Sequence, residues 1–273
     1  MVHGLDDGRT ATLLLAPNPG PMTGRGTNTY VIAAEAGCVV VDPGPAIDSH
    51  LEAIRAAGEA AGGIKGVLLT HCHSDHSDAV EPLGEPLLWP LPGVLAEARE
   101  AELETPAGPV TVVPTPGHAA DHVCFVVGRA GFGGDTILGE GSSIVPPRSA
   151  GGSLGEYMRS LDRLDGLGLE LLLPGHGPPI ADPSVAIGAY REHRLSRERD
   201  LLAALESGTR DRGELLDAAW SDVPEAMRPA ADVALQAHLE KLADEGRLPV
   251  GVQAPGFTAE SAEPGVPDRP ARG

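Results

Sequence analysis

Aromatic residues are scarce in this sequence, making up 3% of its 273 residues. Because single-stranded nucleic acids bind largely by stacking their bases on aromatic rings, few platforms for such binding are available. Basic residues are also few, with 20 Lys and Arg against 39 Asp and Glu and a formal net charge of −19. A chain this acidic repels nucleic acids overall, so an RNA partner would need a local basic patch or a metal site that binds the phosphate.

Cysteine and long apolar runs are equally limited. The three cysteines, Cys38, Cys72 and Cys124, cannot form a complete set of disulfides, and their spacing matches no zinc-finger pattern. No apolar run is long enough to span a bilayer, and the polar residues 1–9 lack the basic and apolar blocks of a secretory signal. We therefore expect a cytoplasmic protein with no membrane partner.

Short β-like runs and two helical segments alternate over the first 180 residues, which predicts a layered α/β fold. One helix is expected over 48–61, and another from Ser153, where Ser153 and Glu156 form a capping box. The expected strands are 29–33, 38–41, 67–69, 110–113, 122–127 and 169–173.

The pattern becomes helical after residue 182. Helices are expected over 184–206, 212–220 and 227–245, and the extended segment GRLPVGV follows them. We therefore expect three parts. These are an α/β domain of residues 1–182, a small winged-helix-like α domain of 183–250, and a tail of 251–273 that is disordered because it is rich in Pro, Gly and charge.

The segment THCHSDH, residues 70–76, follows an apolar strand and crowds three histidines and an aspartate together. Side chains two apart in extended backbone point the same way, so His71 and His73 can reach one ion. Asp75 and His76 come where the chain turns and could hold a second ion close by. Zinc favours imidazole nitrogen with some carboxylate oxygen, and this segment supplies both.

Three remote residues could complete such a site. His118 lies in TPGHAADH, Asp135 in GGDTILG and His176 in LLLPGHG. Each of these residues comes after a predicted strand and next to a glycine. Loops at the ends of strands are where the ligands of a site at a sheet edge are commonly found. Taken singly, each is more typical of a turn residue, and only the joint pattern favours a metal site.

The order HxHxDH, Gly-His, Gly-Asp and PGHG resembles the metallo-β-lactamase superfamily over residues 10–182. The resemblance implies an αβ/βα sandwich with its site at one edge of two packed sheets. It also implies ligands for two zinc ions per chain, although the set would accept manganese or iron as well. By this resemblance, His71, His73 and His118 bind the first metal, Asp75, His76 and His176 bind the second, and Asp135 bridges both.

The same resemblance gives Asp42, in VVVDPG, the role of an aspartate that orients the ligand loop without touching the metals. A simple turn aspartate before Pro43 is the alternative. Asp135 stands where antibiotic-degrading lactamases carry a cysteine ligand, which makes the site similar to that of glyoxalase II, lactonases and nucleases. His73 argues against the di-iron, oxygen-reducing branch.

Longer stretches, including GTNTYVI, GDTILGEGSS and LLPGHGPPI, resemble the lactamase-β-like protein 2 family up to about residue 250. This resemblance implies a hydrolase in which a metal-bridging hydroxide attacks a carbonyl carbon or a phosphorus, with Asp75 and Asp135 as catalytic residues. Members include an endoribonuclease for single-stranded RNA and thioesterases for carrier-bound polyketides. The substrate therefore stays open between short single-stranded RNA and a small anionic ester or thioester, with a hydroxyacylglutathione-hydrolase-like activity as an alternative.

Four residues are candidates for substrate binding. Arg194 and Arg197 share one face of the helix 184–206, and we expect that face near the site, where the arginines would bind an anion. Ordinary surface pairing of these arginines with glutamates of the same helix is the alternative. Asn28 and Tyr30, in GTNTY, resemble a family loop near the metals.

A hypothesis from another class is a non-catalytic regulator that binds DNA through its C-terminal unit. A winged helix of that kind needs a basic recognition helix, whereas residues 227–245 are acidic on balance. We therefore expect no double-stranded DNA partner. The C-terminal unit is expected instead to cover the site or to form a homodimer.

Overall fold

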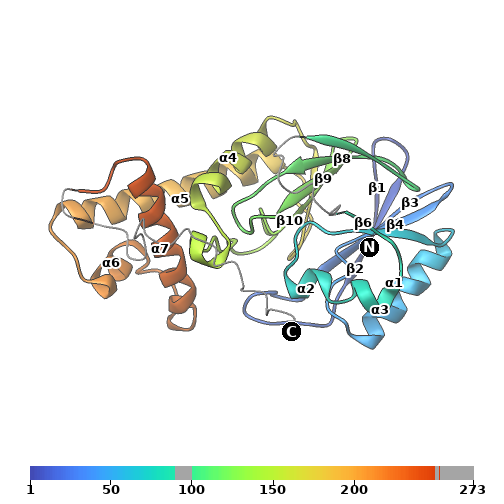
Figure 1. Ribbon diagram of the computed structural model, residues 1–273, viewed down its shortest axis with the longest axis horizontal. Coiled ribbons are helices and arrows are strands. Elements are labelled where there is room, and N and C mark those ends of the chain that lie inside the picture. Colours follow the sequence, from blue (N-terminus) through green and yellow to red (C-terminus); the bar gives the residue numbers. More distant parts are fainter. Residues whose placement is uncertain (90–99, 250–251, 253–273) are drawn as a thin grey trace, which may run out of the picture.

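The computed structural model describes residues 1–89, 100–249 and 252, and in these ranges the strands form two sheets of six and five strands (Figure 1). The first sheet has the order β1-β2-β3-β4-β5-β6. Its first four strands pair antiparallel, whereas β4, β5 and β6 run parallel. The strands are β1 (Val2–Gly4), β2 (Thr10–Leu15), β3 (Asn28–Ala34), β4 (Gly37–Val41), β5 (Ile64–Leu68) and β6 (Leu87–Trp89).

The second sheet has the order β11-β10-β9-β8-β7. Its pairs are antiparallel except for β10 and β11, which run parallel. Because β10 and β11 run parallel, their carboxyl ends, which lead to Asp135 and His176, lie side by side at one edge of this sheet. The strands are β7 (Ala101–Thr105), β8 (Gly108–Pro114), β9 (Val123–Val127), β10 (Ala130–Gly134) and β11 (Leu171–Pro174).

The apolar faces of the two sheets pack against each other. Tyr30 of β3 meets Phe132 of β10 edge to face at 5.4 Å, and both side chains are buried in this central core. Helix α1 (Asp48–Ala60) covers the outer face of the first sheet with Leu51 and Ile54. Helix α4 (Leu154–Asp165) covers the second sheet from the other side. The predicted αβ/βα sandwich is therefore confirmed.

Local sequence signals set the helix boundaries well. Ser153 caps α4 by accepting a hydrogen bond from the backbone N–H of Glu156 at 3.3 Å, which is one half of the predicted capping box. The other half does not form, because the Ser153 N–H donates to the carbonyl of Gly117 and the Glu156 carboxylate pairs with Arg159. Asp182 caps α5 (Pro183–Glu206) in the same way, and a proline at the first helical position suits a helix start. Short helix α2 (Ser74–Ser77) includes the end of the histidine-rich segment, and a second short helix, α3 (Val80–Leu83), follows it.

The C-terminal unit forms a second body with its own apolar core, to the left in Figure 1. It contains α6 (Arg212–Ala219), the 3-10 turn η2 (Glu225–Met227) and α7 (Arg228–Asp244). Long helix α5 joins the two bodies, because Ile187 and Tyr190 pack on the sandwich whereas Leu201 and Leu205 enter the C-terminal core.

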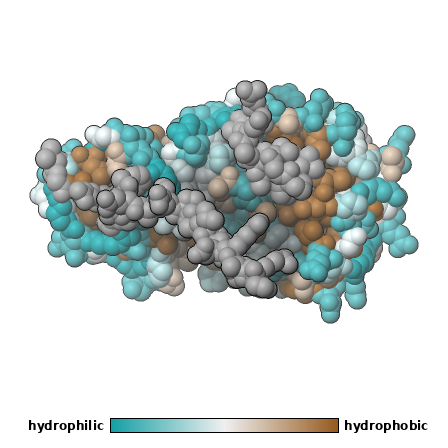
Figure 2. All heavy atoms as spheres, viewed as in Figure 1, coloured by the Kyte–Doolittle hydropathy of each residue, from teal (hydrophilic) through white to brown (hydrophobic). Residues whose placement is uncertain are grey.

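Residues 250 and 251 of the predicted C-terminal wing lie outside the described residues, as does all of the predicted tail, 251–273, except Val252. Residues 246–249, the described start of the wing, form a turn and coil. Hydrophilic residues cover much of the face shown in Figure 2, and apolar residues gather over part of the sandwich. In the described ranges, no helix is both long and apolar enough to cross a membrane.

Candidate metal centre

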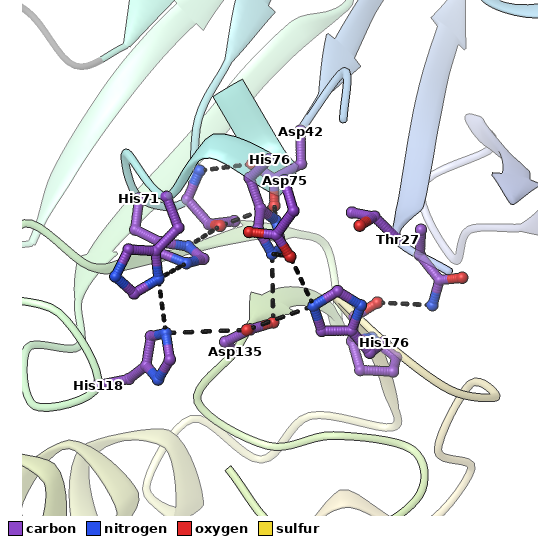
Figure 3. Close-up of polar contacts among 12 residues, drawn as sticks. Thr27, Asp42, His71, Asp75, His76, His118, Asp135 and His176 are labelled. Carbon is purple, nitrogen blue, oxygen red and sulfur yellow. Dashed lines mark hydrogen bonds and ion pairs between the residues drawn. The ribbon is translucent and has the colours of Figure 1, made fainter. Parts of the chain in front are cut away.

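Three histidine rings converge beyond the end of β5. Nε2 of His71 and Nε2 of His118 each lie 3.0 Å from Nδ1 of His73 (Figure 3). His71 and His73 lie in the extended segment between β5 and α2, and His118 lies in the loop between β8 and β9. Their ring nitrogens lie within 4.8 Å of one another, an arrangement that can hold a metal ion.

A second group forms beside the first. Oδ2 of Asp75 lies 3.2 Å from Nε2 of His176 and 3.6 Å from Nε2 of His76. Asp75 and His76 belong to α2, whereas His176 follows β11. These three ligand atoms also lie within 4.8 Å of one another, so the group can hold a second ion.

The carboxylate of Asp135 lies between the two groups. Its Oδ2 is 3.8 Å from Nε2 of His118 and 3.4 Å from Nε2 of His176, and its Oδ1 is 3.5 Å from Nε2 of His76 (Figure 3). The structure thus brings together all seven side chains that the sequence pattern selected. Oδ2 of Asp135 faces a histidine of each group, and Oδ1 faces the second group, so this carboxylate is placed to be shared by two ions.

The polar atoms of this cluster fit a cation. Nε2 of His76 and Oδ1 of Asp135 are buried, and neither finds a hydrogen-bond partner in the described part of the chain. Burial lowers the pKa of His76, but the carboxylates of Asp135 and Asp42 outweigh that effect and raise this pKa well above its ordinary value. A buried nitrogen and a buried carboxylate oxygen that face each other without partners are the ligand atoms that zinc and similar ions take.

Asp42 supports the cluster from behind. It accepts hydrogen bonds from the backbone N–H of Thr70 at 2.8 Å, from the hydroxyl of Thr70 at 2.7 Å, and from Nδ1 of His76 at 3.0 Å. Asp42 adopts a positive φ of 49°, which is uncommon for a non-glycine residue. The arrangement favours the orienting role over that of a simple turn aspartate.

Backbone carbonyls orient two other rings. The carbonyl of Ile144 lies 2.8 Å from Nδ1 of His118, and the carbonyl of Gly26 lies 3.2 Å from Nδ1 of His176. A carbonyl can only accept, so Nδ1 of each ring donates to it, and Nε2 is the nitrogen that faces the cluster. Both rings are therefore oriented with Nε2 toward the candidate metal positions.

His122 is a further member of the site that sequence reasoning missed. Its Nε2 accepts a hydrogen bond from the backbone N–H of Asp135 at 3.1 Å, its Nδ1 lies 2.9 Å from Oγ1 of Thr115, and its ring stacks on His71 at 4.9 Å. Burial places the pKa of His122 well below the ordinary value, which keeps the ring neutral and able to accept. Its place in TPGHAADH, four residues after His118, was the available signal.

The centre opens into a cavity of about 460 Å³. Its walls are largely apolar and include Met22, Leu138 and Ile144. Met227, from the C-terminal unit, also lines it, so that unit covers one side of the cavity. Arg25 and Glu140 are the charged side chains of the lining outside the metal cluster.

The two arginines predicted to bind substrate do not line this cavity. Arg194 is buried and donates to the carbonyl of Ser143, with its guanidinium over the ring of Tyr157. Arg197 donates to the carbonyl of Ala219 and forms an ion pair with Asp222. Both guanidinium groups therefore bind protein partners, which the helix spacing did not predict, rather than the cavity.

Asn28 and Tyr30 are also structural in their contacts. Asn28 donates from Nδ2 to the carbonyls of Pro174 and Gly177, and the Tyr30 hydroxyl donates to the carbonyl of Pro174 at 2.8 Å. Both side chains are buried and hold the loop that carries His176. They lie close to the metal centre, as expected, but they do not line the cavity.

Comparison with known proteins gives two family matches. Residues 22–84 and 78–176 match the family described as the metallo-beta-lactamase superfamily. Residues 213–249 match the beta-lactamase associated winged helix domain. The first match covers the metal cluster, and the second covers α6 and α7.

Similar proteins extend over most of the chain. A beta-lactamase-like protein 2 homolog of Drosophila melanogaster is 31% identical, with 88% of this chain and 90% of that protein covered. An atrochrysone carboxyl ACP thioesterase of Aspergillus chevalieri is 29% identical, with 88% and 83% covered. The crystal structure of a metallo-beta-lactamase family protein from Thermus thermophilus superposes with a TM-score of 0.69 at 27% identity, with 86% and 94% covered.

Proposed function

We propose that this chain, which belongs to the metallo-beta-lactamase superfamily and is a hydrolase of that fold, cleaves an acyl thioester. The reaction would use two divalent ions, and we expect these ions to be zinc. The observation that carries this proposal is the cluster of seven ligand side chains, five of which line the cavity. A non-catalytic regulator would have no need for a complete ligand set that opens to a substrate-sized space.

Each of the two ligand groups would hold one metal ion. His71, His73 and His118 would hold one ion, and Asp75, His76 and His176 the other. Asp135, whose carboxylate lies close to both groups, would be the ligand that the two ions share. When bound, such ions supply a nucleophilic water at neutral pH and polarise the carbonyl under attack.

Asp75 is the side chain best placed to move a proton. Its carboxylate is 29% exposed and lines the cavity, whereas that of Asp135 is 12% exposed. One oxygen of Asp75 faces His176, so the other is left to accept a proton from the attacking water. Asp135 instead fixes the spacing of the two groups.

The cavity favours a thioester over RNA. Its apolar wall of Met22, Ile144 and Met227 can receive an acyl chain by excluding water from it. The helix arginines that would have tracked a phosphate backbone bind protein groups instead. The resemblance to a carrier-protein thioesterase points the same way.

We also propose that the chain is organised as residues 1–182 for the catalytic domain and 183–250 for the C-terminal unit. Asp182 is the cap of α5, which makes it a natural boundary. Met227 then makes the second unit part of the substrate cavity.

The test compares S-octanoyl pantetheine with a single-stranded RNA oligonucleotide on one zinc-loaded preparation, together with an Asp135→Ala variant. Thioester hydrolysis that disappears in the variant is expected. Cleavage of RNA with no turnover of the thioester would contradict the proposal and would place the chain with the nucleases.

A further inference from the structure

We propose that Arg25 is the anion-recognition residue of this site, and that it binds a phosphate or carboxylate carried by the substrate. The proposal rests on the proposed function for the identity of the substrate, but the pairing of Arg25 with an anion can be measured without any reaction. Arg25 is exposed and lines the cavity at the metal centre.

The first observation is the pattern of ion pairing. In the ranges that the structure describes, every other arginine forms a hydrogen bond or ion pair with the protein. Arg25 has neither within the same ranges, although the chain carries 39 acidic residues against 20 basic ones. Glu140, which lines the same cavity, does not pair with it. An unpaired guanidinium in so acidic a chain is available to a ligand.

The second observation is the rigidity of the loop that carries Arg25. Gly20 and Gly24 pair through two backbone hydrogen bonds, and the N–H of Gly26 donates to the carbonyl of Thr23 at 2.9 Å. Gly26 has a φ of 138°, and a Cβ there would lie 2.0 Å from the carbonyl oxygen of Ala16. The backbone on both sides of Arg25 is therefore fixed, so less ordering is needed when its side chain binds a ligand.

The third observation is where this loop points. The carbonyl of Gly26, next in the chain to Arg25, accepts from Nδ1 of His176. Arg25 thus extends from the backbone that orients a metal ligand, on the cavity side of that ligand. The Met227 wall belongs to the same cavity, so an acyl chain and an anionic group can be held together.

The shared chemistry of the ligand is an anionic oxygen group, which guanidinium binds with charge-assisted hydrogen bonds. Two parts of a carrier thioester could supply it. One is the phosphate of a phosphopantetheine arm, and the other is a carboxylate on the acyl chain.

The experiment measures dissociation constants of three thioethers that cannot be hydrolysed, by calorimetry on the zinc-loaded full chain. They are S-octyl pantetheine, S-octyl phosphopantetheine and S-(7-carboxyheptyl) pantetheine. In the wild type, one of the anionic ligands is expected to bind about tenfold more tightly than the neutral one. The ligand that shows this advantage identifies the source of the anion.

The variants decide whether Arg25 is responsible. Arg25→Gln should reduce the advantage to less than about twofold, and Arg25→Lys should retain part of it because the charge remains. Arg199→Gln is the matched control, since Arg199 is an exposed arginine of α5 that pairs with Glu192, and it should keep the full advantage. Thermal unfolding of each variant verifies that the fold is intact.

Equal binding of charged and neutral ligands by the wild type would overturn the proposal, and so would an advantage that survives Arg25→Gln. One further result would contradict the proposed function without affecting the role of Arg25. If the anionic preference depends on Arg25 but S-octanoyl pantetheine is not hydrolysed, the anion site stands and the thioesterase assignment fails.

Discussion

Oδ2 of Asp42 lies 3.0 Å from Nδ1 of His76, and this contact turns the opposite nitrogen of the ring, Nε2, toward Asp135. The same aspartate also holds the N–H and hydroxyl of Thr70, the residue that precedes the ligand segment. One buried carboxylate thus sets both the path of the loop and the orientation of one ligand within it.

Replacement of Asp42 is therefore expected to act on metal binding. Asp42→Asn keeps a residue type that tolerates positive φ, but it removes the charge that orients His76. Zinc affinity should fall by about 10- to 100-fold, as is usual for groups that orient metal ligands. Competition with a chromophoric chelator measures the change, and Asp78→Asn, at an exposed aspartate that directly follows α2, is the control. Equal affinities in the two variants would contradict the orienting role.

The absence of a side chain at Gly175 leaves room for the side chains of Asp135 and His76 beside it. A Cβ at this position would lie 2.4 Å from Oδ1 of Asp135 and 2.7 Å from Cε1 of His76. Gly175→Ala should therefore displace both ligands, weaken zinc binding and lower the free energy of unfolding by about 1–3 kcal/mol. Titration with zinc and denaturant unfolding measure the two effects.

Gly188→Ala is the matched control for that experiment, because a Cβ at Gly188 of α5 meets no atom within 4 Å. It should raise the free energy of unfolding by up to about 1 kcal/mol through its helix propensity and leave zinc binding unchanged. Loss of zinc in both variants would show that the effect is not local to the centre.

Met227 tests whether the C-terminal unit shapes the substrate site. Met227→Ala removes apolar surface from one wall of the cavity, so KM for S-octanoyl pantetheine should rise by about 5- to 20-fold. KM for S-acetyl pantetheine should change little, because a short chain does not reach that wall. Val233→Ala, on the partly exposed surface of α7, is the control. An equal effect on both substrates would argue against an acyl-binding role.

Arg194 links helix α5 to the loop that carries Asp135. Its guanidinium donates to the carbonyl of Ser143, whose hydroxyl donates to the carbonyl of Asp135 at 2.6 Å. Arg194→Met leaves that buried carbonyl without its donor, which should lower the free energy of unfolding by about 1–3 kcal/mol. Thermal and denaturant unfolding measure this change in the free energy of unfolding. Arg199→Met, at an exposed ion pair, should stay within about 0.5 kcal/mol of the wild type.

Features fixed by neighbouring residues could be predicted from the sequence. The helix expected over 184–206 is observed as Pro183–Glu206, because its cap and its apolar spacing are local signals. The convergence of His71 and His73 follows from their separation along extended backbone in the same way. The remote ligands were found because each lies just after a strand, and strand ends gather at one edge of the sandwich.

Partners far away in the chain could not be predicted. Tyr30 and Asn28 bond to Pro174, about 145 residues later, so their role in holding the His176 loop has no local signal. The spacing of Arg194 predicts that it faces the sandwich, but it does not reveal that a carbonyl 51 residues earlier is the acceptor. Arg25 gave no signal at all, since its importance depends on the absence of a partner among the described residues.

The most direct test of the account is the number of divalent ions bound per chain. Isothermal titration of the metal-free protein with zinc, checked by elemental analysis after gel filtration, measures it. We expect two ions per chain in the wild type and one in His118→Ala, which removes a ligand from only the first group. A wild type that binds one ion or none, or a variant that still binds two, would contradict the two-metal centre.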